Sequence, residues 1–173
     1  MTDGDPVMGE PIQPPDVAHL PEGTRRMLTA AAARRLPVEV RPRPAASSLA
    51  EAAAILGITP ADIAKTLVVR HSGGSYLFAV IAGDTQIAWP RLRAAVGVNK
   101  MTLPDAAAAL AATGYERGTI TPIGAQGDWP VYVDNRLIAR RVAMGSGAHG
   151  YSAFVEIDDL VAAYGATVAD IAG

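Results

Sequence analysis

Two apolar runs on either side of a short glycine turn constrain the fold more than any other feature of the sequence. The run Leu67-Val68-Val69-Arg70 is followed by His71-Ser72-Gly73-Gly74-Ser75 and then by the strongly apolar stretch from Tyr76 to Ala82. Aliphatic β-branched and aromatic residues are enriched in strands, and a short glycine-containing segment joins neighbouring strands. The sequence therefore predicts a β-hairpin over residues 67–82.

Helical patterns alternate irregularly with further strand patterns around this hairpin. Ser48 and Glu51 form a capping box before a helix that Gly57 ends. An apolar stripe predicts a helix over 21–35, and a short helix is expected to begin at Thr59. Further helices are predicted over 89–96, 104–112 and 158–164, and strands over 36–40, 131–133, 141–144 and 152–157. This mixture favours an α+β domain around a mixed sheet.

Length and composition fit one globular domain. The chain has 173 residues, half of them hydrophobic, and no cysteine, which excludes disulfides and thiolate chemistry. Residues 1–20 are rich in Pro, Gly and Asp and predict a disordered or loosely packed leader before a single domain over 21–173. No secretory signal or membrane-spanning run is found, so a cytoplasmic protein is expected.

The charge balance limits how this chain can hold a nucleic acid. The net charge is −2, whereas proteins that grip long stretches of phosphate backbone are usually basic. We expect it to hold at most a short end of a nucleic acid, or to gain affinity from a partner. The basic residues that could do so include Arg91, Arg93, Lys100, Arg136, Arg140 and Arg141, although each is equally well explained as a solvated surface charge.

Several common catalytic motifs are missing. The sequence contains no G-x-S-x-G, no H-E-x-x-H and no G-x-x-x-x-G-K-[ST], and its three histidines lack metal-ligand spacing. We therefore expect no metal and no cofactor. Gly145 to Gly150 matches G-x-G-x-x-G, but a β-rich segment follows where a dinucleotide site needs a helix. This segment predicts a strand–turn–strand whose exposed N–H groups can line a pocket.

Three segments remain as candidates for function. Lys65 is one of only two lysines in an arginine-rich chain and lies between a helix end and a buried strand. A lysine can shift its pKa or act as a compact donor, although a snorkelling surface lysine explains the pattern equally well. The Gly/Pro-rich segment 114–124 and the glycine turn 145–150 are the other two, and each has a plain structural explanation as a loop.

Taken in order, these segments carry a family resemblance. Ala64-Lys65-Thr66-Leu67-Val68, Ala82-Gly83-Asp84, Thr113-Gly114-Tyr115, Gly118-x-x-x-Pro122-x-Gly124 and the glycine turn resemble the YbaK and prolyl-tRNA-synthetase-associated editing domains, also called YbaK/EbsC. The similarity runs from about residue 52 to residue 170. It implies an α+β fold with a mostly antiparallel, barrel-like sheet flanked by helices. It also implies hydrolysis of misacylated tRNA, typically tRNA for proline carrying Ala, Cys or a similar small residue.

The resemblance also implies which residues form the site. Lys65 corresponds to the residue on which activity depends, and the two loops correspond to walls of the amino-acid pocket. The substrate partner is the acceptor end of aminoacyl-tRNA, with prolyl-tRNA synthetase as an expected associate. The implied substrate-binding residues are Thr66, Gly118, Thr121, Pro122, Ile123, Gly124, Gly145, Ser146, Gly147 and His149.

One departure from the family pattern leaves alternatives open. Members of the family that act on Cys-tRNA often carry an acid just after the glycine turn, where this chain has Ser152. This departure does not favour the thiol-assisted route, and the choice between water, the terminal ribose hydroxyl and a substrate thiol stays open. A non-catalytic module that binds an aminoacyl end, and an esterase acting on something other than tRNA, remain the alternative functions.

Overall fold

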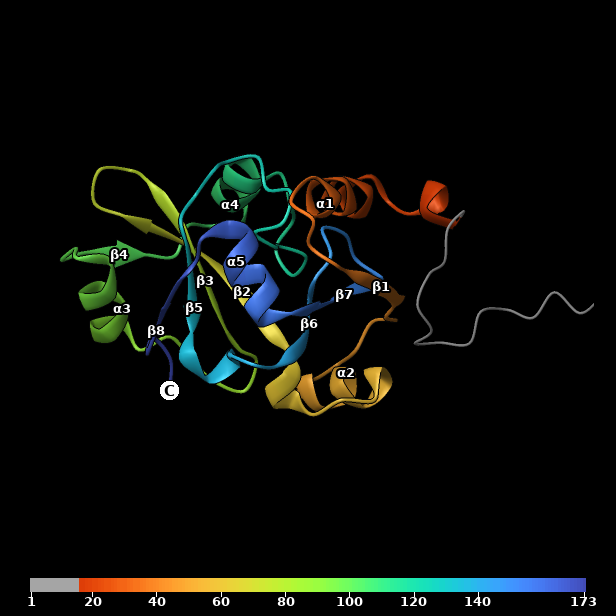
Figure 1. Ribbon diagram of the computed structural model, residues 1–173. Coiled ribbons are helices and arrows are strands. Elements are labelled where there is room, and N and C mark those ends of the chain that lie inside the picture. Colours follow the sequence, from red (N-terminus) through yellow and green to blue (C-terminus); the bar gives the residue numbers. More distant parts are fainter. Residues whose placement is uncertain (1–15) are drawn as a thin grey trace, which may run out of the picture.

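The computed structural model describes residues 16–173, which form a mixed α+β fold with two β-sheets (Figure 1). The predicted leader, residues 1–20, therefore falls mostly outside the described residues. Leu20, at its end, is buried in the core. The helices are α1 (Glu22–Ala33), α2 (Leu49–Leu56), α3 (Trp89–Val96), α4 (Ala106–Thr113) and α5 (Ile157–Tyr164), with short 3-10 turns η1 (Asp16–His19), η2 (Pro60–Asp62) and η3 (Asn135–Leu137). The strands are β1 (Glu39–Pro42), β2 (Ala64–His71), β3 (Tyr76–Ala82), β4 (Met101–Thr102), β5 (Val131–Asp134), β6 (Arg141–Gly145), β7 (Tyr151–Glu156) and β8 (Thr167–Ala169).

The larger sheet is built on the predicted hairpin, which is confirmed. β2 and β3 pair antiparallel from Ala64↔Ala82 to Arg70↔Tyr76. The strand order is β4-β2-β3-β5-β8, with β5 parallel to both β3 and β8. The sheet is therefore mixed, as the sequence predicts.

The smaller sheet holds the glycine turn. Its order is β1-β7-β6, and both pairings are antiparallel. The segment between β6 and β7 is the predicted strand–turn–strand, which excludes a dinucleotide-binding helix there. A bridge between Ile63 and Ala143 connects the two sheets beside the start of β2.

The core lies on both faces of the larger sheet, which explains why β3 is apolar along its whole length. On one face Phe78 and Val80 pack in the main cluster between the two sheets, together with Met144 and Val155. On the other face Leu77, Ala79 and Ile81 pack with Leu92 of α3 and Ile171. A strand buried on both faces has no polar side to alternate with the apolar one. The hairpin that carries Lys65 is therefore fixed from both sides.

Most predicted elements are confirmed, with small shifts. Ser48 caps α2 by accepting a hydrogen bond from the Glu51 N–H, and Gly57 ends the helix in the left-handed conformation. The Glu51 carboxylate accepts from Ser47 rather than from the Ser48 N–H, so the capping box is displaced by one residue. The strand predicted over 36–40 lies instead at Glu39–Pro42, because its pairing with β7 begins at Glu39↔Phe154.

Candidate functional site

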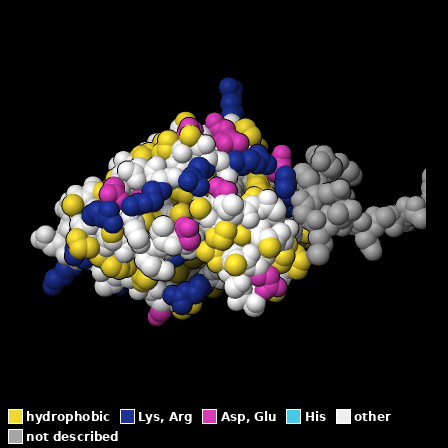
Figure 2. Space-filling view, turned by 90° about the horizontal axis from the view of Figure 1, so that it is seen from below, with side chains coloured by type: hydrophobic (Ala, Val, Ile, Leu, Met, Phe, Trp, Pro, Cys, Tyr) yellow, Lys and Arg dark blue, Asp and Glu magenta, His cyan; other side chains and the backbone are white. Residues whose placement is uncertain are grey.

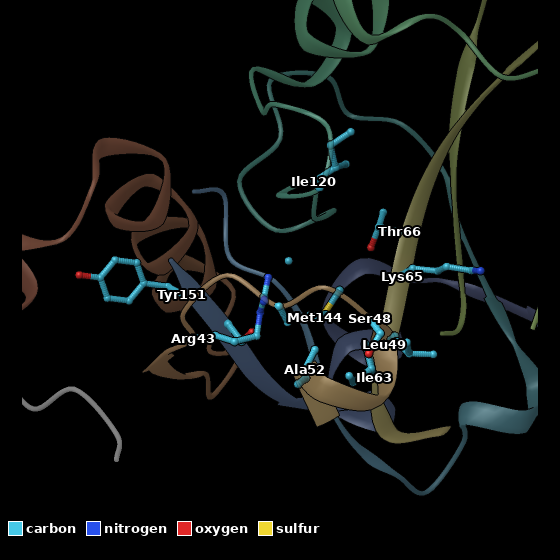
Figure 3. A pocket seen from close by; sticks show the side chains of 16 residues that line it. Arg43, Ser48, Leu49, Ala52, Ile63, Lys65, Thr66, Ile120, Met144 and Tyr151 are labelled. Atoms are coloured by element: carbon cyan, nitrogen blue, oxygen red, sulfur yellow. The ribbon is translucent and has the colours of Figure 1, made fainter. Parts of the chain in front are cut away.

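A cavity of about 300 Å³ opens between the start of β2, the end of β6 and helix α2 (Figure 3). We call it the first cavity. The Ile63–Ala143 bridge places the two sheets side by side at its floor. Its volume is at the low end of the range for ligand-binding pockets, so it suits a small group rather than a large cofactor. Its lining residues are Arg43, Ala46, Ser48, Leu49, Ala52, Ile63, Ala64, Lys65, Thr66, Gly118, Ile120, Ala143, Met144, Gly145, Tyr151 and Ser152.

Lys65 and Thr66 both line this cavity, but only Thr66 directs its side chain toward Ile120 and Arg43 (Figure 3). They are neighbours on β2, and Figure 3 shows their side chains leaving the strand on opposite sides, as alternation along a strand requires. Both residues are half-buried, and the Thr66 Oγ1 atom is buried without a hydrogen-bond partner among the described residues. A buried hydroxyl without a partner is costly, so Thr66 offers an unused donor and acceptor to a ligand.

Two loops close the upper part of the cavity. Gly118 and Ile120 come from the loop before β5, and Gly145 ends β6. The Gly147 N–H donates to the Thr119 carbonyl at 2.9 Å, which fixes one loop on the other. At Gly145 a Cβ atom would clash with the carbonyl oxygens of Thr119 and Ile120, so this position requires glycine.

The structure brings together only part of the predicted site. Lys65, Thr66, Gly118 and Gly145 line the first cavity. Pro122 and Gly124 line a second cavity beside Trp129 and Tyr164, and Gly147 and His149 line a third, beside α1 and α4. Thr121, Ile123 and Ser146 are buried and do not line any of these three cavities.

The buried residues of this set hold the loops by hydrogen bonds. The Thr121 hydroxyl accepts from the Ile123 N–H at 3.2 Å. The Ser146 hydroxyl contacts the carbonyl oxygens of Ala148 and Tyr151, each at 3.1 Å. These contacts explain why the two segments stand out in the sequence, since both depend on side chains that stabilise the turns.

Tyr115 supports both loops from behind. Its hydroxyl donates to the Ile123 carbonyl at 2.8 Å, and the Arg26 guanidinium lies over its ring at 4.4 Å from the centroid. Burial raises the pKa of Tyr115 above its ordinary value, and the neighbouring Arg26 opposes this shift in part. The tyrosine therefore stays neutral and keeps its donor at neutral pH.

The chemistry available in the first cavity is limited. Among its lining residues, all within the described part of the chain, Arg43 and Lys65 are the charged ones, and none is an acid, a histidine or a cysteine. No group of three His, Cys, Asp or Glu residues suited to a metal occurs within residues 16–173. The site can therefore orient a substrate and donate hydrogen bonds to developing negative charge, which is a sufficient contribution for cleaving an activated ester.

Of the six basic residues predicted to be able to hold an acceptor end, four pair with acids, and Arg93 and Lys100 are in none of the ion pairs of the described residues. Arg91 and Arg136 both pair with Asp170, Arg140 pairs with Asp62, and Arg141 pairs with Glu39 at 2.8 Å. Figure 2 shows the same mixture, with acidic side chains scattered among the basic ones on the face that it presents. A continuous basic track for a long stretch of nucleic acid is not present on that face, in agreement with the net charge.

The sequence profile of one family decides the classification. The profile described as the aminoacyl-tRNA editing domain matches residues 43–163, which include all of β2 and both loops. The chain belongs to the aminoacyl-tRNA editing domain family. It is accordingly an aminoacyl-tRNA deacylase, an enzyme that hydrolyses the ester between an amino acid and tRNA, and its substrate class is aminoacyl-tRNA.

Similar proteins agree with this classification. A proline–tRNA ligase of Shouchella clausii is 31% identical to the editing domain over 115 residues, which are 66% of this chain and 20% of the ligase. The chain thus spans about a fifth of the length of that relative. A hypothetical protein of known structure is 29% identical with a TM-score of 0.79, covering 86% of this chain and 99% of its own. A candidate trans-editing enzyme for prolyl-tRNA synthetase has a TM-score of 0.80 at 24% identity, covering 89% and 99%, and shows the same fold.

Several lining residues of the editing domain were not found by sequence reasoning. Leu49, Ala52, Ile63 and Met144 supply most of the apolar wall, and Arg43 supplies a second cation. The apolar residues carry no signal beyond that of any core position. Arg43 does carry a signal in the sequence, because it stands between two prolines after a strand. Prolines restrict the backbone, so the loop that holds this side chain is fixed.

No helix of the described chain is long and apolar enough to cross a membrane.

Proposed function

We propose that this editing domain removes a small, wrongly attached amino acid, such as alanine or cysteine, from tRNA for proline, acting in trans beside prolyl-tRNA synthetase. The observation that carries the proposal is the first cavity, which places Lys65 and Thr66 at the edge of a small, mostly apolar chamber. The similarity to a proline–tRNA ligase supports proline as the tRNA identity.

The size of the chamber supports a small acyl group. The walls include the small side chains of Ala46 and Ala52 and the compact one of Ile63, and the bridge between the two sheets lies among the lining residues. The bridge does not move without breaking strand pairing, so a larger side chain is rejected by volume. One methylene changes binding by only about 1–3 kcal/mol, which gives graded rather than absolute selection among small amino acids.

Lys65 is the proposed catalytic residue. In the reaction a water molecule, oriented by the neighbouring ribose hydroxyl, attacks the ester carbonyl carbon. The bond to the acylated ribose oxygen then breaks, that oxygen takes up the proton that the water loses, and the free amino acid leaves. The Lys65 side chain leaves β2 on the side opposite Thr66 (Figure 3), and its flexible stem would bring the ammonium round the strand to donate to the carbonyl oxygen as negative charge develops there. The unpartnered Thr66 hydroxyl is placed to orient the acyl group or the attacking oxygen. No side-chain nucleophile is required, because the aminoacyl ester is already activated.

A deacylation panel tests the proposal. Wild type, Lys65→Ala and Lys100→Ala are each incubated with tRNA for proline charged with Ala, Cys, Ser, Thr or Pro. We expect rapid cleavage of the alanyl or cysteinyl ester and a loss of about a hundredfold or more in Lys65→Ala, the usual effect of removing one oxyanion donor. Lys100 is the other lysine, exposed and outside the first cavity, so Lys100→Ala is expected to retain activity.

Two results would contradict the proposal. If Lys65→Ala cleaves every ester as fast as wild type, the site assignment is wrong. If no ester is cleaved even with prolyl-tRNA synthetase present, the chain acts as a binding module for the aminoacyl end.

A further inference from the structure

Two arginines at the end of β1 have different surroundings. Arg41 pairs with Glu39 at 3.2 Å and lies over the Phe154 ring, 4.4 Å from its centroid. Arg43 lies two residues later, lines the first cavity and is half-buried. The ion pairs formed within residues 17–173 do not include Arg43. One arginine is thus part of the surface structure, and the other brings a free cation to the site.

The backbone around Arg43 fixes where its side chain begins. Its N–H donates to the Gly150 carbonyl at 2.8 Å, which joins it to the glycine turn, and prolines stand on both sides. Nη1 donates to the Pro44 carbonyl at 3.2 Å. The other guanidinium N–H groups have no protein acceptor among the described residues and remain available to a ligand. Figure 3 shows Arg43 on one side of the cavity and Lys65 on the strand at the other side, with Met144 between them and the Lys65 side chain directed away from Arg43.

A partly buried cation without an acid calls for an anionic ligand. Withdrawing a guanidinium from water is costly unless an anion or several acceptors replace the water. The lining residues, all within the described chain, contribute two cations and no carboxylate, so the field inside the first cavity favours negative charge. Arginine also matches a phosphate better than lysine does, because its planar fork donates two parallel hydrogen bonds.

The acceptor end of a tRNA offers one kind of anion. The ester, the ribose and the base are uncharged, the amino acid carries an ammonium, and the negative charge lies on the phosphodiesters. We propose that Arg43 is a substrate-binding residue that holds the phosphodiester joining the last two nucleotides, while the aminoacyl group enters the chamber beside Lys65. This inference rests on the proposed function, since it assigns a subsite to the same substrate. Arg43 would then fix the distance between the backbone and the reacting ester.

Minimal substrates test the inference. Wild type, Arg43→Ala, Arg43→Lys and Arg41→Ala are compared on 3′-O-alanyl-adenosine with a free 5′-hydroxyl and with a 5′-methylphosphate. We expect wild type to prefer the phosphate-bearing ester by about tenfold or more in kcat/KM, as one charge-assisted contact allows. Arg43→Ala is expected to lose this preference, Arg43→Lys to keep part of it, and Arg41→Ala to keep it in full. Thermal unfolding shows which variants are folded.

A binding measurement separates the inference from the catalytic proposal. The 3′-amide analogues of the same two compounds cannot be cleaved, and calorimetry gives their affinities. A phosphate preference that depends on Arg43 supports the inference even if no ester is hydrolysed, in which case the proposed function alone fails. The inference is overturned if wild type binds and cleaves both compounds equally, or if Arg43→Ala keeps the preference. It is also overturned if Arg43→Ala instead loses a preference for an aspartyl over an alanyl ester, because Arg43 then binds a side-chain carboxylate.

Discussion

The first and third cavities lie against the same glycine turn, yet their charges differ. The first is lined by Arg43 and Lys65 and by no acid, whereas the third is lined by Glu22 and Glu116 as well as Arg26. Arg26 is already used there, because it donates to the Gly114 carbonyl at 2.9 Å and lies over Tyr115. The third cavity is no smaller, at about 380 Å³. The volume of a cavity therefore does not identify the site for an anionic substrate. The presence of cations without neighbouring acids does.

The largest expected effect on activity comes from filling the first cavity, with the third cavity filled as a control. Ala52 lines the first cavity and Ala148 the third, and leucine at either position adds three carbon atoms. We expect Ala52→Leu to lower kcat/KM for alanyl-tRNA by about tenfold or more, because its chamber is small, a loss of the order that a few methylenes confer. Ala148→Leu should change kcat/KM for alanyl-tRNA by no more than about twofold. The deacylation assay measures kcat/KM for both variants. Equal losses in the two variants would remove the distinction between the cavities.

Tyr115, which supports the loop before β5, gives an intermediate effect. Tyr115→Phe deletes the hydrogen bond to the Ile123 carbonyl, which we expect to cost about 1–2 kcal/mol of unfolding free energy. Burial raises the pKa of Tyr115, so the folded state keeps a proton that the unfolded state loses near pH 10. Wild-type stability should therefore fall as the pH rises above about 10, and less steeply in the variant. Urea unfolding between pH 7 and pH 11 measures both, and identical slopes would contradict the assignment.

The smallest effect is expected at His149. Its ring lies 3.2 Å from the Glu116 carboxylate, with both side chains 68% exposed, and it faces the third cavity. Exposed ion pairs contribute about 0–1 kcal/mol. We expect His149→Ala to change kcat/KM by less than about threefold. A loss of a hundredfold would instead support its predicted role as a substrate-binding residue and assign function to the third cavity.

The sequence predicts what local chemistry determines and misses what only tertiary contacts determine. Helix α2 was predicted because Ser48 and Gly57 mark its ends, and the hairpin because an apolar run on each side of a glycine turn has few other solutions. Strands β4 and β8 have two and three residues and exist through pairing with β2 and β5, so no periodicity reveals them.

The candidate site follows the same division. Lys65 stood out because lysine is rare in this chain, and the loops because glycine and proline are conspicuous. A loop has two sides, however, and its residues face different cavities: Gly118 faces the first, Pro122 the second, and Thr121 neither. Which side each residue faces depends on the neighbouring segment that covers it. The two prolines beside Arg43 mark a fixed loop in the sequence, but only the pairing of β1 with β7 places that loop at the first cavity.

The bridge between Ile63 and Ala143 has a consequence for how such enzymes diversify. The backbones of Ile63 and Ala143 are committed to strand pairing, while Leu49, Ala52 and Met144 line the chamber with side chains that can be replaced. A single substitution at one of these three positions can enlarge or reduce the chamber and leave the scaffold intact. Members of such a family can thus come to prefer different amino acids through single substitutions, while the topology of the fold stays the same.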